Sequence, residues 1–109
     1  MTLRPPSRSS SSQPARLAAL DYEIAQEQVS ALGRLGRALE AALAALADYE
    51  RRHQARDAVR AKLVQDASDA LWCLMVQREA IGLRDPRPVI RDYRVPAEVH
   101  NRMGAFGRR

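Results

Sequence analysis

The chain has 109 residues, of which 46% are hydrophobic and only 5% aromatic, and its formal net charge is +5. This length suits a single domain, and the shortage of large apolar residues allows only a thin core. No apolar run is long enough for a transmembrane helix, and no apolar segment follows the arginines near the N-terminus, so we expect neither a membrane span nor a secretory signal. One cysteine cannot form an internal disulfide, which favours the reducing cytoplasm.

Positive charge is concentrated at the two ends of the chain, whereas residues 21–50 have a net negative charge. Basic ends are one way to bind phosphates, so a small nucleic-acid-binding protein is an alternative function. Nucleic-acid-binding arms usually have denser basic runs with aromatic residues between them. A composition rich in arginine and alanine also follows from a high-GC genome without any functional cause.

Residues 1–14 are rich in Ser, Pro and Arg and have little to bury, so we expect a disordered arm. A helical pattern follows over residues 15–52, with an apolar stripe at 3.6-residue spacing and many alanines beside it. The stripe comprises Leu17, Leu20, Ile24, Gln28, Ala31, Leu32, Leu35, Leu39, Leu43 and Leu46. Such a helix is too long for a compact globule of this size to cover.

Two glycines interrupt this helix, and each costs roughly 1 kcal/mol relative to alanine. They indicate either the close approach of another backbone or a kink at Gly36. A nucleic-acid-binding GxxG loop would need a flanking β-sheet, which the sequence does not predict. We therefore predict that this face of the helix is an interface between two copies of the chain. The predicted interface consists of Leu32, Gly33, Leu35, Gly36, Leu39 and Leu43.

The apolar pattern lapses at residues 50–58, which predicts a polar corner and the end of the first helix. Asp57 is the expected N-cap of a second helix that ends at Gly82. Within this helix, residues 70–76 (ALWCLMV) are apolar on every side. We expect this segment to be covered all round, with Cys73 buried and inert.

The C-terminal tail contains the start and stop signals of two short helices. Asp85–Pro86 and Val95–Pro96 predict their starts, and Gly104 predicts the end of the second. Apolar residues on one side of each helix indicate that the tail packs on the ALWCLMV segment. The expected docking core consists of Trp72, Met75, Ile90, Tyr93 and Phe106. Ion pairs are expected to hold the tail in place, and they involve Asp66, Asp69, Arg84 and Arg91.

Glu50 and His53 have the Glu-x-x-His spacing that places two ligands on one helix face in di-iron bundles. A di-metal helical bundle is therefore a second alternative function. A complete site needs further inward carboxylates, and a polar corner usually holds solvated side chains, so we expect no cofactor. The sequence has no phosphate-binding loop and no nucleophile with a paired base, so we expect no enzymatic activity.

Four short segments carry a resemblance to a known family: DALW at 69–72, VQRE at 76–79, GLRD at 82–85 and DYRVP at 92–96. Through them, residues 63–104 resemble an uncharacterised family, a domain of unknown function, of small bacterial helical proteins. The resemblance implies a bacterial, cytoplasmic protein and attaches no activity to it.

These features together predict an all-α fold with one helical domain over residues 15–106. The domain would be a long antiparallel helical hairpin followed by two short C-terminal helices. Because a hairpin cannot bury so long a stripe by itself, we expect a C2 homodimer in a four-helix arrangement. The expected function is a non-enzymatic interaction or scaffold protein, for which a further protein partner is an open alternative. The acidic first helix argues against membrane binding.

Overall fold

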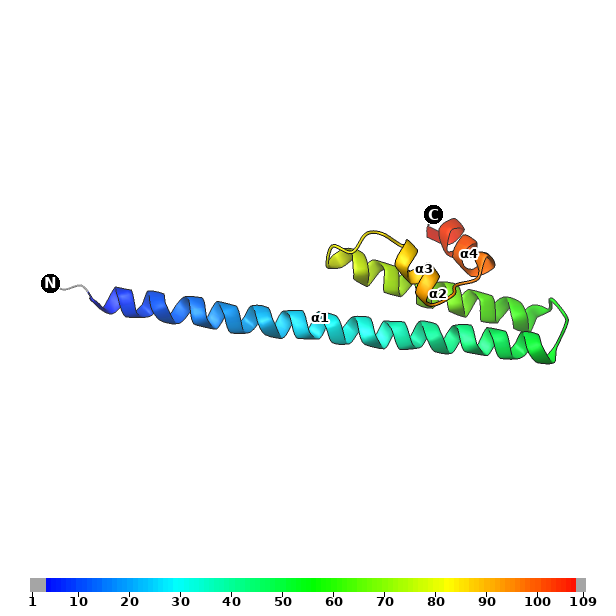
Figure 1. Ribbon diagram of the computed structural model, residues 1–109, viewed down its shortest axis with the longest axis horizontal. Helices are drawn as coiled ribbons and strands as arrows, with labels where there is room; N and C mark the ends of the chain where they lie inside the picture. The colour runs from blue at the N-terminus through cyan, green and yellow to red at the C-terminus, as the bar shows by residue number, and fades with distance from the viewer. Residues whose placement is uncertain (1–3, 108–109) are drawn as a thin grey trace. The chain divides into compact units, whose positions relative to one another are not determined.

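The computed structural model describes residues 4–107, with the side chains of residues 13–103. Four helices cover most of these residues: α1 (Arg4–Arg52), α2 (Ala58–Ala80), α3 (Arg87–Asp92) and α4 (Ala97–Gly107), with no strand in the range described (Figure 1). The predicted all-α fold, with a long first helix and two short C-terminal ones, is confirmed. The chain divides into two compact units, Met1–Ser30 and Ala31–Arg109.

The described part of the first unit is a stretch of α1 alone. The helix begins at Arg4, upstream of the predicted start near residue 15, and Pro14 lies inside it. Serine, glutamine and arginine are acceptable in a helix, so only the prolines oppose helix formation in this stretch. The disorder of residues 1–14 in solution stays a prediction.

The second unit contains a helical hairpin whose corner is formed as predicted. α1 ends at Arg52, and the side chain of Asp57 caps α2 by accepting a hydrogen bond from the Arg60 backbone N–H at 3.0 Å. α2 is followed by a turn at Gly82, which has φ +90°. The N–H of Gly82 donates to Glu79 and that of Leu83 donates to Arg78, which is the Schellman pattern of a helix C-terminus.

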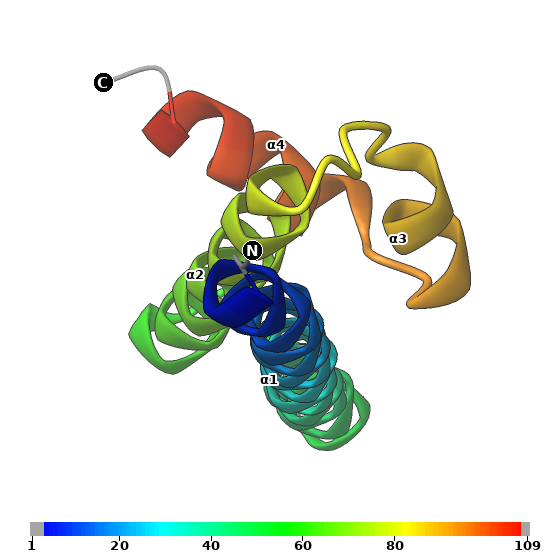
Figure 2. The same ribbon diagram turned by 90° about the vertical axis from the view of Figure 1, so that its left-hand side faces the viewer.

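One hydrophobic core joins all four helices within this unit. Its buried members are Leu39, Leu46, Val64, Ala67, Leu71, Leu74, Val89, Val95 and Val99. α4 lies against α2 in both views (Figures 1 and 2). Ser68 is a small residue at this contact, and its buried hydroxyl donates to the Val99 carbonyl at 3.1 Å.

Gly36 lies where a side chain could not fit. A Cβ atom at this position would fall on the hydroxyl of Tyr93 and lie 3.4 Å from its Cζ. Gly36 is closely approached, but by a ring of the same chain rather than by another backbone, which is the neighbour that the sequence predicted. Gly33 has more room, since its added Cβ would meet only the Arg37 guanidinium at 3.4 Å.

The turn between α3 and α4 repeats the Schellman pattern without a glycine. Arg94 adopts φ 54°, its N–H donates to Arg91, and the N–H of Val95 donates to Ile90. Val95 is buried beside the turn. α4 continues to Gly107, past the end predicted at Gly104.

Candidate functional site

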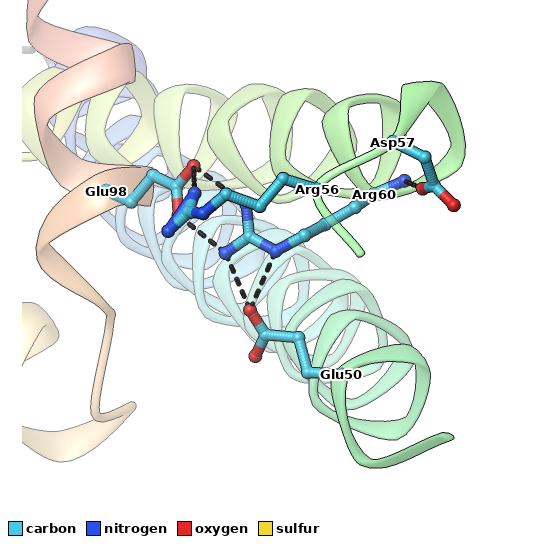
Figure 3. A network of polar contacts seen from close by, with 5 residues as sticks. All are labelled: Glu50, Arg56, Asp57, Arg60 and Glu98. Carbon is cyan, nitrogen blue, oxygen red and sulfur yellow. Dashed lines mark hydrogen bonds and ion pairs between the residues drawn. The ribbon is translucent and has the colours of Figure 1, made fainter. Parts of the chain in front are cut away.

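Arg60 of α2 forms ion pairs with α1 and with α4 near the corner of the hairpin. Its side chain is only 12% exposed, and its guanidinium lies between two carboxylates (Figure 3). It donates to Glu50 of α1 through Nε at 3.0 Å and Nη2 at 2.6 Å. It donates to Glu98 of α4 through Nη1 at 2.9 Å and Nη2 at 2.6 Å. Arg60 thus forms an ionic clamp with Glu50 and Glu98, which the sequence pattern does not reveal because the partners are far apart in the chain.

The electrostatics of the clamp keep Glu98 and Arg60 charged. The hydrogen bond from Arg60 lowers the pKa of Glu98, and Arg56, 3.7 Å from Glu98, adds to this effect. The two carboxylates in turn raise the pKa of Arg60. A carboxylate held ionised by a guanidinium is a poor general acid or base at neutral pH. The clamp therefore fits a structural role better than a catalytic one.

Glu50 and His53, the candidate metal ligands, have different partners. Glu50 accepts from Arg60, whereas the His53 ring stacks on Tyr49 with centroids 4.3 Å apart. The Tyr49 hydroxyl donates to Asp57, and this hydrogen bond lowers the pKa of Asp57. Within the residues that the structure describes, no three His, Cys, Asp or Glu side chains lie close enough together to hold a metal ion.

The ion pairs predicted for the tail are replaced by other contacts. Asp66 pairs with Lys62 at 2.6 Å, and Asp69 accepts from Gln65 at 2.8 Å. Both partners lie one turn earlier on α2, where a local contact forms at little entropic cost. Arg91 pairs with its neighbour Asp92, and Arg84 is exposed.

The tail is instead anchored from α4 and from the end of α2. Arg102 donates to Gln65 at 2.6 Å, and Glu98 enters the ionic clamp. Arg78 donates to the Asp85 carbonyl at 2.9 Å.

The predicted docking core is formed only in part. Met75, Ile90 and Tyr93 are partly buried against the core, whereas Trp72 is 38% exposed. The side chain of Phe106 lies outside those described. The expectation that residues 70–76 are covered all round is wrong, because α1 and the tail pack on one side of α2 and leave Trp72, Cys73 and Val76 exposed. Cys73 is therefore not buried.

The predicted interface on α1 is largely used within the chain. Leu39 is fully buried in the core and Gly36 is covered by Tyr93. The leucines of this set that remain, Leu32, Leu35 and Leu43, pack partly against the same core. Gly33 is also partly buried.

Further toward the N-terminus, the same stripe of α1 is exposed. Leu17, Leu20 and Ile24 are 57%, 52% and 56% exposed. We call these three residues the α1 stripe. Tyr22 and Val29, at 64% and 68%, lie on the other side of the helix. The periodicity of the sequence includes the α1 stripe, but it cannot tell which part of a long stripe is covered within the chain.

The basic tail is partly neutralised by its own carboxylates. Arg87 pairs with Asp85 at 2.9 Å, and this contact lowers the pKa of Asp85 to about 2. Arg91 is paired with Asp92 in the same way. Such pairs reduce the positive potential that a phosphate backbone would meet.

A depression lies between α1 and the turn after α3, lined by Glu40, Leu43, Asp92, Tyr93 and Arg94. Its charged side chains are exposed and of both signs, which favours no particular ligand. In the part of the chain described here, none of the helices has the length and apolar character that crossing a membrane requires.

The class defined by these observations is a small all-α protein with a helical hairpin, a docked two-helix tail and an ionic clamp at the hairpin corner. The chain belongs to a family of unknown function, DUF6665, whose family model matches residues 9–109. The match confirms the resemblance seen in residues 63–104 and extends it over most of the first helix. A search of curated proteins and a search of solved structures each gave no match.

Proposed function

We propose that this protein is a non-catalytic interaction protein that acts as a homodimer, and that the α1 stripe is the surface through which two copies associate. The observation that supports this proposal is the exposure of Leu17, Leu20 and Ile24, each by more than half, on one side of α1. Apolar residues that recur on one face of a helix usually mark a surface covered by a partner.

The chain's own architecture favours a second copy as this partner. α1 has 49 residues and α2 has 23, and the other helices described are shorter still, so none of them matches the first in length. Another copy brings a helix of the same length with the same stripe. A C2 pairing of identical surfaces is also the commonest way for soluble proteins to associate.

The size of the α1 stripe suggests modest affinity. Full burial of a leucine or isoleucine side chain stabilises by about 1.5–3 kcal/mol, and association must first offset about 4–15 kcal/mol of lost freedom. The six residues of two copies are each just over half exposed, so their burial supplies about 5–10 kcal/mol, which is comparable to this cost. We therefore expect a weak dimer that dissociates at high micromolar to millimolar concentrations.

Light scattering after size exclusion, across a range of loading concentrations, tests the proposal. The wild-type mass is expected to rise toward twice 12.2 kDa with concentration. Leu20→Glu should keep the mass at that of a monomer. Val29→Glu is the matched control, because Val29 is more exposed than Leu20 and lies on the other side of α1.

A wild-type mass near 12.2 kDa at every concentration would overturn the proposed homodimer. The same holds if Val29→Glu dissociates the dimer as strongly as Leu20→Glu, because the association would then not depend on the α1 stripe.

A further inference from the structure

We propose that the two α1 stripes pair antiparallel, with Arg16 of each chain facing Glu23 and Glu27 of the other. This inference rests on the proposed homodimer and adds its orientation and charge pairing. It begins from the residues around the α1 stripe, which lie on α1.

Helical geometry places the charges of this segment on two different flanks of the stripe. At 100° per residue, Leu17, Leu20 and Ile24 span an arc of about 60°. Arg16, Glu23 and Glu27 all lie on one flank of that arc, within about 40° of one another.

The other flank of the α1 stripe carries Asp21 and Gln28, by the same geometry. One flank therefore holds a base at its N-terminal end and two acids at its C-terminal end. The second flank has no basic residue between positions 13 and 30.

In an antiparallel pair, like flanks of the two helices face each other. The register that buries the most apolar surface places Leu17 opposite the partner's Ile24 and brings the two Leu20 side chains together. In that register, Arg16 lies level with the stretch of the partner between its Glu23 and Glu27. The pairing occurs twice, once at each end of the interface.

In a parallel pair, unlike flanks face each other, and identical residues meet along the stripe. Arg16 would then face only Asp21 of the other chain, and Glu23 would face Gln28. The two Glu27 side chains, which border the stripe, would approach each other, just as the two Asp21 side chains do in the antiparallel pair. Each Arg16 has two carboxylates opposite in the antiparallel arrangement and one in the parallel arrangement, so charge complementarity favours the antiparallel arrangement.

Disulfide trapping tests the orientation. The exposed Cys73 is first replaced by serine. Leu17→Cys and Ile24→Cys are then made in separate chains, one of them tagged, and the chains are mixed and equilibrated with oxidised and reduced glutathione. A disulfide forms only where two Cα atoms come within about 7 Å. The antiparallel arrangement predicts the mixed 17–24 product above either single product.

The outcomes separate this inference from the proposed function. Predominant 17–17 and 24–24 products would overturn the antiparallel orientation and leave the dimer in place. No product, together with a monomeric mass before oxidation, would overturn both.

Charge reversal provides a second readout without cysteines. Arg16→Glu should weaken dimerisation roughly three- to tenfold, as expected for the loss and reversal of two exposed ion pairs. Adding Glu23→Arg should restore most of the affinity, because the two reversed charges would then attract each other across the interface. A parallel dimer would show no rescue, since position 23 would face Gln28, and this result would overturn the proposed orientation.

Discussion

At the scale of single residues, the two glycines of α1 differ in what surrounds them. A methyl group at position 36 would collide with the Tyr93 hydroxyl, whereas at position 33 it would touch only the end of the flexible Arg37 side chain. Gly33→Ala should therefore gain most of the helix propensity of alanine, about 1 kcal/mol. Gly36→Ala should instead destabilise the fold, because the stiff Tyr93 ring must move.

Urea denaturation of both variants checks this expectation. Adding Tyr93→Phe should relieve much of the loss in Gly36→Ala, because the nearest remaining ring atom would be 3.4 Å from the new Cβ. Equal stability of the two alanine variants would contradict the packing described at Gly36.

The ionic clamp predicts a contribution to the pH dependence of stability. Arg60 lowers the pKa of Glu98 below its ordinary value of 4.5, and Arg56 and Arg102 act in the same direction. A carboxyl whose pKa is lower in the folded state stabilises the fold above its unfolded pKa. This contribution is lost as the pH falls through the folded pKa. Glu98→Gln should therefore lower the midpoint of urea denaturation at pH 7 and have a smaller effect at a pH of about 3.

The comparison at two pH values distinguishes the clamp from a general packing defect. Ser68→Ala serves as a control, because it removes a buried hydrogen bond without removing a titratable group. Its cost, about 1 kcal/mol, should be similar at both pH values. A pH-independent effect of Glu98→Gln would show that the clamp does not act through ionisation.

At the scale of elements, the two Schellman turns differ in the residue at the left-handed position. α2 is followed by Gly82 with φ +90°, whereas α3 is followed by Arg94 with φ 54°. A residue with a Cβ is strained by about 1 kcal/mol or more in this region. Arg94→Gly should therefore stabilise the fold by about 1 kcal/mol, since the backbone hydrogen bonds of the turn are unchanged. Thermal denaturation followed by circular dichroism measures the change. A lower melting temperature would indicate that the Arg94 side chain contributes more than its strain.

At the scale of the whole molecule, every buried core residue among those described belongs to the second unit, Ala31–Arg109. A chain that begins at residue 31 should therefore unfold cooperatively, with a urea midpoint close to that of the full chain under conditions where the full chain is monomeric. It should also be monomeric at all concentrations, because the α1 stripe has been removed. If this shorter chain still self-associates, the interface does not involve the α1 stripe. The exposed face of α2 around Trp72 and Val76 would then be the expected interface.

The sequence alone predicts the elements well because their boundaries depend on local chemistry. Asp57 caps α2 through a hydrogen bond to a neighbour three residues away, and Gly82 supplies the φ that ends it. Such contacts are encoded within a few residues. The sequence predicts a later start of α1, near residue 15, because helix propensity in residues 4–14 is moderate and prolines usually lie at or before a helix start.

The candidate sites were predicted less well because they depend on which surfaces meet. Periodicity identifies an apolar stripe on α1 but does not tell that Leu39 is covered by the chain and Leu20 is not. The same limit explains Cys73, whose apolar neighbours in sequence lie around the helix rather than around the thiol. It also explains the clamp, since Glu98 is 38 residues from Arg60.

The sequence by itself thus determined the helical class and the hairpin corner, because these follow from propensity and capping. Only the tertiary structure decided that Tyr93 lies against Gly36, that Arg60 joins Glu50 to Glu98, and that one face of α2 stays exposed. The physical reason is that a helix has several faces of similar chemistry. The choice among them is made by long-range packing, which depends on all the elements at once.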